Sequence, residues 1–188
     1  MWKKLNKWWQ RSQQPLAPEI QKFEQTIVIN QQHYLIAVAK QGDVADIFAV
    51  EEAAYYGVTP WPLEVFADEI ARTHERLYLI LRTATTNEMV AYAGAVFAAG
   101  AKDAHVTNVA VLPAWQRQGL AQALLTYTMS LAVQHHYQSM TLEVQVDNCK
   151  ARRLYQKIGF TDLRLRRDYY GPGVDAQEMR VSLGGELQ

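Results

Sequence analysis

The chain has 188 residues, nineteen Lys and Arg balance nineteen Asp and Glu, and 49% of the residues are hydrophobic. This length fits one domain of ordinary size, and the composition excludes a disordered chain. A net charge of zero argues against bulk nucleic-acid binding, which normally requires a basic protein. The single cysteine, Cys149, excludes an internal disulfide framework and a four-cysteine zinc site, and predicts a cytoplasmic protein.

The first part of the chain differs in composition from the rest. We predict that residues 1–32 are a basic, Trp-containing extension and that residues 33–188 form the domain. A helix near the start would place Trp2, Leu5 and Trp9 on one face. Such a helix can make peripheral contact with an anionic membrane surface; the alternative is a mobile tail whose tryptophans dock on the domain. No apolar run reaches the roughly 20 residues that a membrane span needs.

Strands and helices are predicted within the domain in the order β-α-α-β-β-β-α-β-α-β-β. Alternation and apolar periodicity predict strands over residues 34–39, 77–81, 89–98, 106–112, 139–146, 159–167 and 177–183. Helices are predicted over residues 44–54, 63–70, 122–134 and 149–158. This order favours an α/β fold with one mixed sheet of six to seven strands and four helices on its two faces.

The strongest local signal is the sequence QRQGLA at residues 116–121, between a strand that ends at Pro113 and a long helix. The small residues Gly119 and Ala121 let a ligand approach the backbone. The first amides of a helix lack partners within the helix, and with the helix dipole they form an anion site suited to a pyrophosphate. Arg117 can add a charge-assisted contact. On these residues alone, an ordinary tight turn before a helix is an equally good interpretation.

The surrounding sequence extends this signal into a family resemblance. With Asn108-Val109-Ala110-Val111 before it and TLEVQVDNCKARRLYQKIGF after it, the loop resembles the acetyl-CoA signature of the GCN5-related N-acetyltransferase (GNAT) family. The resemblance implies acetyl-CoA as co-substrate, no metal, and a mainly antiparallel sheet in which two strands splay apart around the pantetheine arm. The residues implied to bind the cofactor are Val109, Val111, Arg117, Gln118, Gly119, Leu120, Ala121, Gln122 and Asn148.

One subgroup of this family fits best, the bacterial ribosomal-protein alanine N-alpha-acetyltransferases of the RimI type. Residues 142–155, residues 166–170 and a Thr59-Pro60-Trp61 turn look like the corresponding segments of that subgroup. The resemblance implies direct acetyl transfer, in a ternary complex, to the N-terminal alanine of a small-subunit ribosomal protein. Gln145 and Asp147 depart from the subgroup pattern and weaken the case for the same peptide specificity.

Two residues are candidates for the proton transfers that acetylation of an amine requires. Glu143 is the candidate base because strand alternation points it away from Leu142 and Val144; otherwise it is a surface Glu on a half-exposed strand. Tyr155 is the candidate acid because it lies two helical turns beyond Asn148 on nearly the same face; otherwise it is a core tyrosine. In the resembling subgroup these residues are the proton acceptor and the proton donor.

The remaining candidates concern the acceptor. We expect Tyr56, Trp61, Asp168 and Tyr170 to form a narrow slot for a peptide that begins with Ala or Ser, although the aromatic residues could instead pack the two loops. A covalent role for Cys149 lacks a histidine placed to activate it. Two other functions stay open: the same chemistry on a lysine or a small-molecule amine, and a non-catalytic acyl-CoA-binding module.

Overall fold

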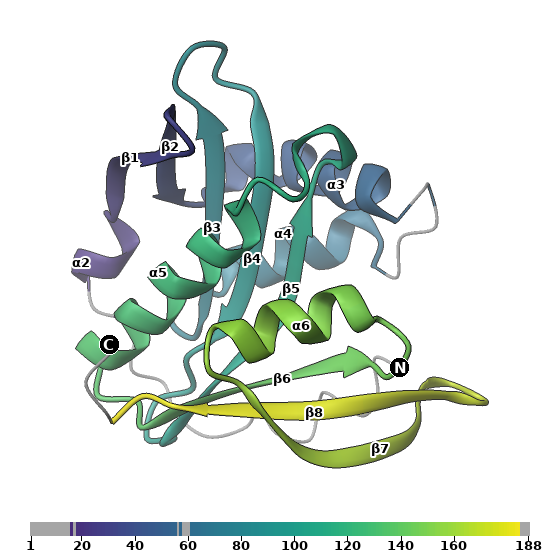
Figure 1. Ribbon diagram of the computed structural model, residues 1–188. Coiled ribbons are helices and arrows are strands. Elements are labelled where there is room, and N and C mark those ends of the chain that lie inside the picture. Colours follow the sequence, from purple (N-terminus) through teal and green to yellow (C-terminus); the bar gives the residue numbers. More distant parts are fainter. Residues whose placement is uncertain (1–15, 17, 56, 58–60, 185–188) are drawn as a thin grey trace.

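Eight strands form one twisted sheet in the order β1-β2-β3-β4-β5-β6-β8-β7 (Figure 1). The computed structural model describes residues 16, 18–55, 57 and 61–184. Neighbouring strands are antiparallel throughout, except that β5 and β6 are parallel. The α/β class and the mainly antiparallel sheet are confirmed, while the predicted six to seven strands are corrected to eight. The strands are β1 (Glu24–Ile29), β2 (Gln32–Val38), β3 (Arg76–Thr83), β4 (Met89–Val96), β5 (Asp103–Val111), β6 (Ser139–Gln145), β7 (Thr161–Gly171) and β8 (Val174–Ser182).

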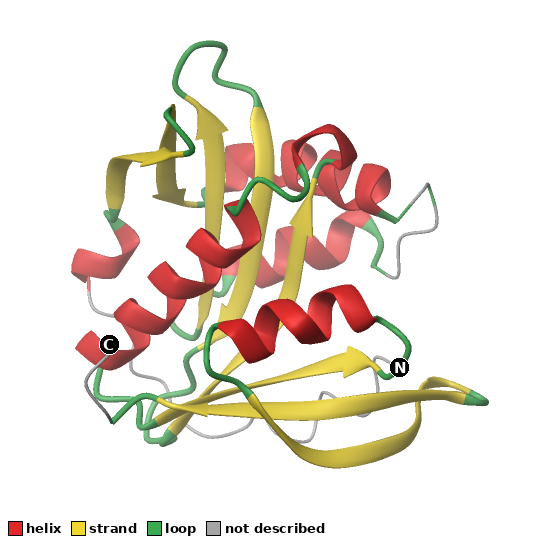
Figure 2. Cartoon of the chain, viewed as in Figure 1, coloured by secondary structure: helices red, strands yellow, loops and turns green. Residues whose placement is uncertain are grey.

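Helices cover both faces of the sheet, as Figure 2 shows in red. The longest, α5, lies with α6 on one face, and α3 and α4 lie on the other (Figures 1 and 2). The four predicted helices are all present, and a single turn, α2, precedes them in the described part of the chain. Their bounds are α2 (Pro18–Gln21), α3 (Val44–Ala54), α4 (Leu63–Ala71), α5 (Leu120–Gln134) and α6 (Cys149–Lys157). Among the described residues, no helix has the length and apolar character that crossing a membrane requires.

The alternation of β3 explains why the sheet is buried on both sides. Leu77, Leu79 and Leu81 point into the core beneath α5, and Tyr78 and Ile80 point into a second core beneath α3 and α4. Successive strand residues face opposite sides of a sheet, so one apolar run supplies both cores. Burying each leucine contributes roughly 1.5–3 kcal/mol relative to leaving it exposed.

The sheet divides where β5 meets β6. The two strands pair only from Asp103 opposite Ser139 to His105 opposite Thr141, and beyond that point they run apart (Figure 1). In β5 the register shifts by one residue at Thr107, which lies between the partners of Ala95 and Gly94 on β4. A bulge of this kind bends a strand and increases its twist. The bend carries the second half of β5 away from β6 and opens the sheet for a ligand.

The N-terminal segment requires a correction. β1 pairs with β2 along its whole length, and Leu16, Ile20 and Ile27 are buried in the core that α5 covers. Leu16, Ile20 and residues 24–32, predicted to lie outside the domain, therefore belong to its sheet and core. The prediction for the first fifteen residues, with its helix carrying Trp2, Leu5 and Trp9, lies outside the described residues.

Candidate active site

The loop before α5 has an unusual backbone. A 3₁₀ turn over Pro113–Trp115 is followed by Arg117 with φ of 65° and by Gly119, the N-cap of α5, with φ of 88°. A side chain at Gly119 would be only 3.6 Å from Ile29 Cγ2, an ordinary contact, so backbone conformation rather than space requires glycine there. The turn presents the first amides of α5, which lack partners within the helix, as an anion site.

Three hydrogen bonds from side chains to backbone carbonyl groups hold this loop. Asn30, in the turn between β1 and β2, donates from Nδ2 to the carbonyl oxygen of Gln118 at 2.8 Å. Gln118 Nε2 donates to the Ala114 carbonyl at 3.3 Å, and Gln116 Nε2 donates to the Val111 carbonyl at 3.1 Å. The β1–β2 hairpin thus braces the loop.

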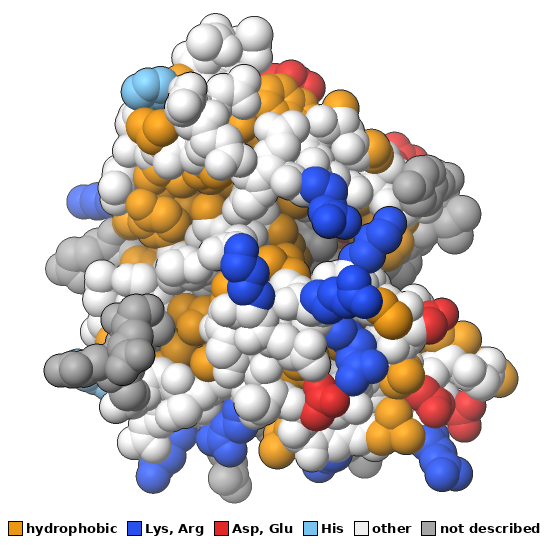
Figure 3. Space-filling model, viewed as in Figure 1, with side chains coloured by type: hydrophobic (Ala, Val, Ile, Leu, Met, Phe, Trp, Pro, Cys, Tyr) orange, Lys and Arg blue, Asp and Glu red, His pale blue; other side chains and the backbone are white. Residues whose placement is uncertain are grey.

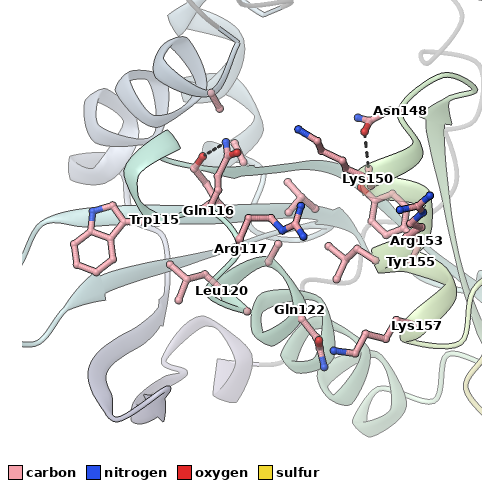
Figure 4. A pocket seen from close by; sticks show the side chains of 18 of the residues that line it. Trp115, Gln116, Arg117, Leu120, Gln122, Asn148, Lys150, Arg153, Tyr155 and Lys157 are labelled. Carbon is pink, nitrogen blue, oxygen red and sulfur yellow. Dashed lines mark hydrogen bonds between the residues drawn. The ribbon is translucent and has the colours of Figure 1, made fainter.

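A cavity of about 590 Å³ lies between this loop, β5 and α6, and we call it the loop cavity (Figure 4). Its lining includes the predicted residues Val109, Val111, Arg117, Gly119, Leu120, Ala121, Gln122 and Asn148. Gln118, also predicted, is not among the lining residues because its side chain turns back to Ala114. The Leu112 amide donates a hydrogen bond to the Val90 carbonyl oxygen of β4. Backbone N–H and C=O groups of successive strand residues point to opposite edges of the strand, so those of Val109 and Val111 point away from β4, toward the opening.

Four cationic side chains line the loop cavity: Arg117 from the loop, and Lys150, Arg153 and Lys157 from α6. Figure 4 shows them on opposite sides of the opening, and Figure 3 shows Lys and Arg side chains gathered over this face of the molecule. The three α6 residues were not predicted from the sequence. Their spacing of three and four residues places them on one face of an amphipathic helix, and this spacing was the signal that could have found them. Amides, cationic side chains and a free strand edge together fit a long ligand that carries phosphates.

A second cavity, of about 460 Å³, continues from the first between the separated strands, and we call it the strand cavity. Tyr55, Val109, Asn148, Ala151 and Tyr155 line both cavities. The other strand-cavity residues include Trp61, His105, Asn108, Glu143, Tyr169 and Tyr170. The two cavities therefore adjoin, and a ligand that fills the loop cavity extends to the side chains of the strand cavity.

Glu143 is the central charged residue of the strand cavity. Its side chain is only 8% exposed, so the alternative of a surface residue on a half-exposed strand does not hold. Glu143 Oε2 lies 3.1 Å from His105 Nε2, and Glu143 Oε1 lies 3.5 Å from Arg166 Nη2. His105 Nδ1 lies 2.8 Å from Thr141 Oγ1, which fixes the imidazole ring on the last paired residues of β5 and β6.

His105 is the main residue of this site that the sequence analysis missed. From the sequence, histidine was considered as a residue that could activate Cys149, and His105 was given no role. The signal lies in the pairing of β5 with β6, since the parallel register places His105 beside Thr141, two residues before Glu143. That register cannot be read from either strand alone.

Tyr155 and Asn148 both lie where the two cavities adjoin. Asn148 is the N-cap of α6, and its Oδ1 accepts a hydrogen bond from the Ala151 amide at 3.1 Å (Figure 4). Burial raises the pKa of Tyr155 well above that of a free tyrosine, and the charge of Tyr55 acts in the same direction. Tyr155 therefore carries its proton at neutral pH and can donate it.

The predicted acceptor residues divide into three groups. Trp61 and Tyr170 line the strand cavity, and the Tyr170 hydroxyl donates to the Glu143 carbonyl oxygen at 3.1 Å. Asp168 is exposed and lines neither cavity; its Oδ1 accepts from the Gly173 amide at 2.6 Å and so shapes the β7–β8 turn. Tyr56 lies outside the described residues.

Two further residues complete the account of the site. Tyr169 lines the strand cavity beside Tyr170, and burial together with the charge of Glu143 raises the pKa of Tyr169 to about 12. Cys149 is an exposed free thiol at the start of α6 and is not among the residues that line either cavity. The described part of the chain gathers no group of three or more potential metal ligands, and the absence of a metal remains a prediction.

Comparison with known proteins agrees with the resemblance in sequence. The family model of the acetyltransferase (GNAT) family matches residues 43–160. The [ribosomal protein bS18]-alanine N-acetyltransferase of Escherichia coli strain K12 is 32% identical over 136 residues, which cover 72% of this chain and 86% of that protein. The enzyme of the same name from Haemophilus ducreyi is 28% identical over 136 residues, covering 72% and 88%.

A solved structure gives the same result. The crystal structure of the ribosomal-protein-S18-alanine N-acetyltransferase from Escherichia coli aligns with a TM-score of 0.71 and 27% identity, covering 82% of this chain and 98% of that one. The chain belongs to the acetyltransferase (GNAT) family, and its fold is that of an acetyl-CoA-dependent N-acetyltransferase. The binding of acetyl-CoA in the loop cavity stays a prediction, which the four cationic residues of its lining favour.

Proposed function

We propose that this enzyme acetylates the N-terminal α-amine of a protein that begins with a small residue, and that its acceptor is the N-terminal alanine of a small-subunit ribosomal protein. The observation that carries the proposal is the buried Glu143–His105 pair in the strand cavity, next to a cavity suited to acetyl-CoA. The names of the bacterial relatives, which act on an alanine of ribosomal protein bS18, support this acceptor.

The chemistry requires two proton transfers. Acetyl-CoA supplies the acetyl group as a thioester; the amine nitrogen replaces the sulfur on the carbonyl carbon, one amine proton departs, and the thiolate gains a proton. Glu143 accepts the amine proton, directly or through one water. His105, 3.1 Å from Glu143 Oε2, shares that proton and keeps the carboxylate oriented. Tyr155, protonated because burial raises its pKa, donates to the leaving thiolate.

The properties of the base favour an α-amine over a lysine side chain. An α-amino group has a pKa near 7.7–8.0, whereas that of lysine is near 10.4, so an α-amine needs a far weaker base at neutral pH. A carboxylate assisted by an imidazole is a base of that modest strength. The proposal therefore assigns the α-amine as acceptor.

The walls of the strand cavity favour a small first residue. Tyr55, Trp61, Tyr169 and Tyr170 contribute four aromatic side chains to this lining. The Tyr169 and Tyr170 rings pack edge to face with centroids 5.0 Å apart, and the Tyr170 hydroxyl is bonded to the backbone of β6. Rings fixed in this way leave space for the end of an extended chain and resist a branched side chain at its first position.

A panel of peptides tests the proposal. Peptides beginning with Ala or Ser should be acetylated at the α-amine, while Leu-first peptides should react at least tenfold more slowly, the scale of discrimination by a small apolar pocket. The matched control is an Ala-first peptide with a blocked α-amine and an internal lysine, which should not react. Mass spectrometry that locates the acetyl group on lysine, or equal rates for Ala-first and Leu-first peptides, would replace this proposal by acetylation of lysine or of a small amine.

A further inference from the structure

Two carboxylates lie side by side beneath the strand cavity. Glu143 of β6 pairs directly across the ladder with Glu178 of β8, so both side chains are on the same face of the sheet. Both are nearly buried, with side-chain exposures of 8% and 7%. Like charges directly opposite one another destabilise a sheet, and two close carboxylates disfavour each other's charged form.

Arg166 of β7 bridges the two carboxylates. Its Nε lies 2.5 Å from Glu178 Oε2, and its Nη2 lies 3.5 Å from Glu143 Oε1. The Tyr169 ring centroid lies 5.7 Å from the centre of the guanidinium group. Burial alone would lower the pKa of Arg166, but the hydrogen bond to Glu178 and the charges of Glu143 and Glu178 raise it. The positive charge of Arg166 therefore lies close to two carboxylates, those of Glu143 and Glu178.

Arg164 offers a natural comparison two residues earlier on the same strand. Its Nε lies 2.6 Å from Glu178 Oε2, its Nη2 lies 3.3 Å from Glu178 Oε1, and its side chain is 59% exposed. The hydrogen bonds and the ion pair of the Arg164 guanidinium group are with Glu178. Burial would raise the pKa of Glu178, yet its hydrogen bonds with Arg164 and Arg166 hold that pKa below the ordinary value. Glu178 is therefore a charged anchor.

We propose that Arg166, anchored by Glu178, is a positioning residue that holds its positive charge beside Glu143 and keeps that carboxylate turned toward His105. The inference rests on the proposed role of Glu143 as the base. Because Glu178 holds Nε and the Tyr169 ring flanks the guanidinium group, Arg166 stays near Glu143 Oε1 and leaves Glu143 Oε2 to His105.

The proposal predicts the direction in which the pH dependence moves. The groups that face Glu143 are His105 from β5, Arg166, Tyr169 and Tyr170 from β7, Glu178 from β8 and, across the strand cavity, Tyr55 and Tyr155. Removing the positive charge of Arg166 makes protonation of both Glu143 and His105 easier. Removing the negative charge of Glu178 makes it harder. The two changes therefore have opposite signs.

The experiment measures kcat against pH with a saturating Ala-first peptide, so that the acidic limb reports the enzyme–substrate complex. R166M should move that limb to higher pH by about 1 unit, the lower end of the effect of a neighbouring charge. E178Q keeps a side-chain oxygen that can accept the hydrogen bond from Arg166 Nε but removes the negative charge, so it should move the limb to lower pH. The double variant R166M/E178Q should lie near the wild type because it removes one charge of each sign. R164M is the matched control and should keep the wild-type limb, because solvent screens its exposed charge.

The outcomes separate this inference from the proposed function. Shifts of opposite sign for R166M and E178Q, with an unmoved limb for R164M, support the positioning role. Reduced kcat with an unmoved limb in R166M, in protein with the wild-type circular dichroism spectrum, would overturn it and leave only a packing role. E143Q in the same series tests the base itself: full turnover in E143Q would overturn the proposed function and the inference together, whereas an inactive E143Q with an unmoved R166M limb would overturn the inference alone.

Discussion

The loop cavity and the strand cavity lie next to each other but are built in different ways. The loop cavity presents backbone amides of one continuous stretch, with a positive-φ glycine in that stretch and cationic side chains in the lining. The strand cavity presents fixed side chains from β5, β6, β7 and the segments next to α3 and α4. The difference suggests that the first cavity determines acetyl-CoA affinity and the second determines rate, with Tyr155 and Asn148 common to both.

Glu143→Gln is expected to have the largest effect on kcat and tests this division between affinity and rate. The change keeps the shape of the side chain but removes the charge that pairs with His105 and Arg166. Loss of a general base should lower kcat roughly 10²–10⁴-fold. The dissociation constant of acetyl-CoA, measured by calorimetry, should stay within about twofold of the wild type, since Glu143 is not among the loop-cavity residues. A large loss of acetyl-CoA affinity would contradict the division.

Tyr155→Phe is expected to have the next largest effect, because this side chain lines both cavities. Loss of the phenolic proton should lower kcat roughly 10²-fold. Since burial raises the pKa of Tyr155, the wild-type enzyme should keep its phenol protonated, and kcat should not fall between pH 8 and the pKa of an unperturbed tyrosine, about 10. A kcat that falls within this range in the wild type but not in Tyr155→Phe would show that Tyr155 loses its proton too easily for the proposed role.

Gly119→Glu should affect binding instead of rate. A non-glycine residue at φ of 88° costs about 1–2 kcal/mol, or roughly tenfold in affinity where the loop must keep its shape. The added negative charge opposes a phosphate-bearing ligand and should increase the loss further. Gly119→Ala is the control for the backbone alone and should lose less affinity than Gly119→Glu. Calorimetry with acetyl-CoA measures both, and wild-type affinity in a folded Gly119→Glu protein would exclude the loop as the anion site.

The cationic rim should give the smallest and most salt-sensitive effect. Lys157→Ala should weaken acetyl-CoA binding by about two- to fivefold at low salt, because an exposed charge contributes about 0.2–1 kcal/mol. The effect should diminish as ionic strength rises and shortens the Debye length. Lys22→Ala, which removes an exposed lysine that lines neither cavity, should leave the affinity unchanged. An equal loss in both variants would assign the effect to net charge.

Part of the lining of the loop cavity could be predicted from the sequence, because its signal is local and the family resemblance decides between an anion site and an ordinary turn. Residues 109–122 are contiguous, and a positive-φ glycine before a helix leaves a direct trace in the sequence. Gln118 is the exception: alternation within a short loop does not tell which side chain turns away, and here a bond to Ala114 decides it. The helices and the buried strands could also be predicted from the sequence, since their apolar periodicity is strong.

The strand cavity was only partly predictable because strand pairing decides it. Glu143 follows from alternation, but His105, Arg166 and Glu178 come together only through the β5–β6, β6–β8 and β7–β8 registers. Asp168 was predicted in the acceptor slot because residues 166–170 resemble the corresponding segment of the subgroup. In the structure its φ is 51° and its Oδ1 accepts a hydrogen bond from the Gly173 amide, so Asp168 shapes the β7–β8 turn. β1 was missed because, as an edge strand, it buries only Ile27 and shows no clear alternation.

The pairing of β1 with β2 also limits how far the chain can be trimmed. A protein that begins at residue 33 would lose Leu16, Ile20 and Ile27 from the core and would expose β2 as a new edge strand. Exposed edges recruit other chains, so the trimmed protein should aggregate and be degraded faster by proteases. It would also lose the Asn30 brace on the Gln118 carbonyl. Expression and crystallisation should therefore retain every residue from Leu16 onward, even though the matched family region begins only at residue 43.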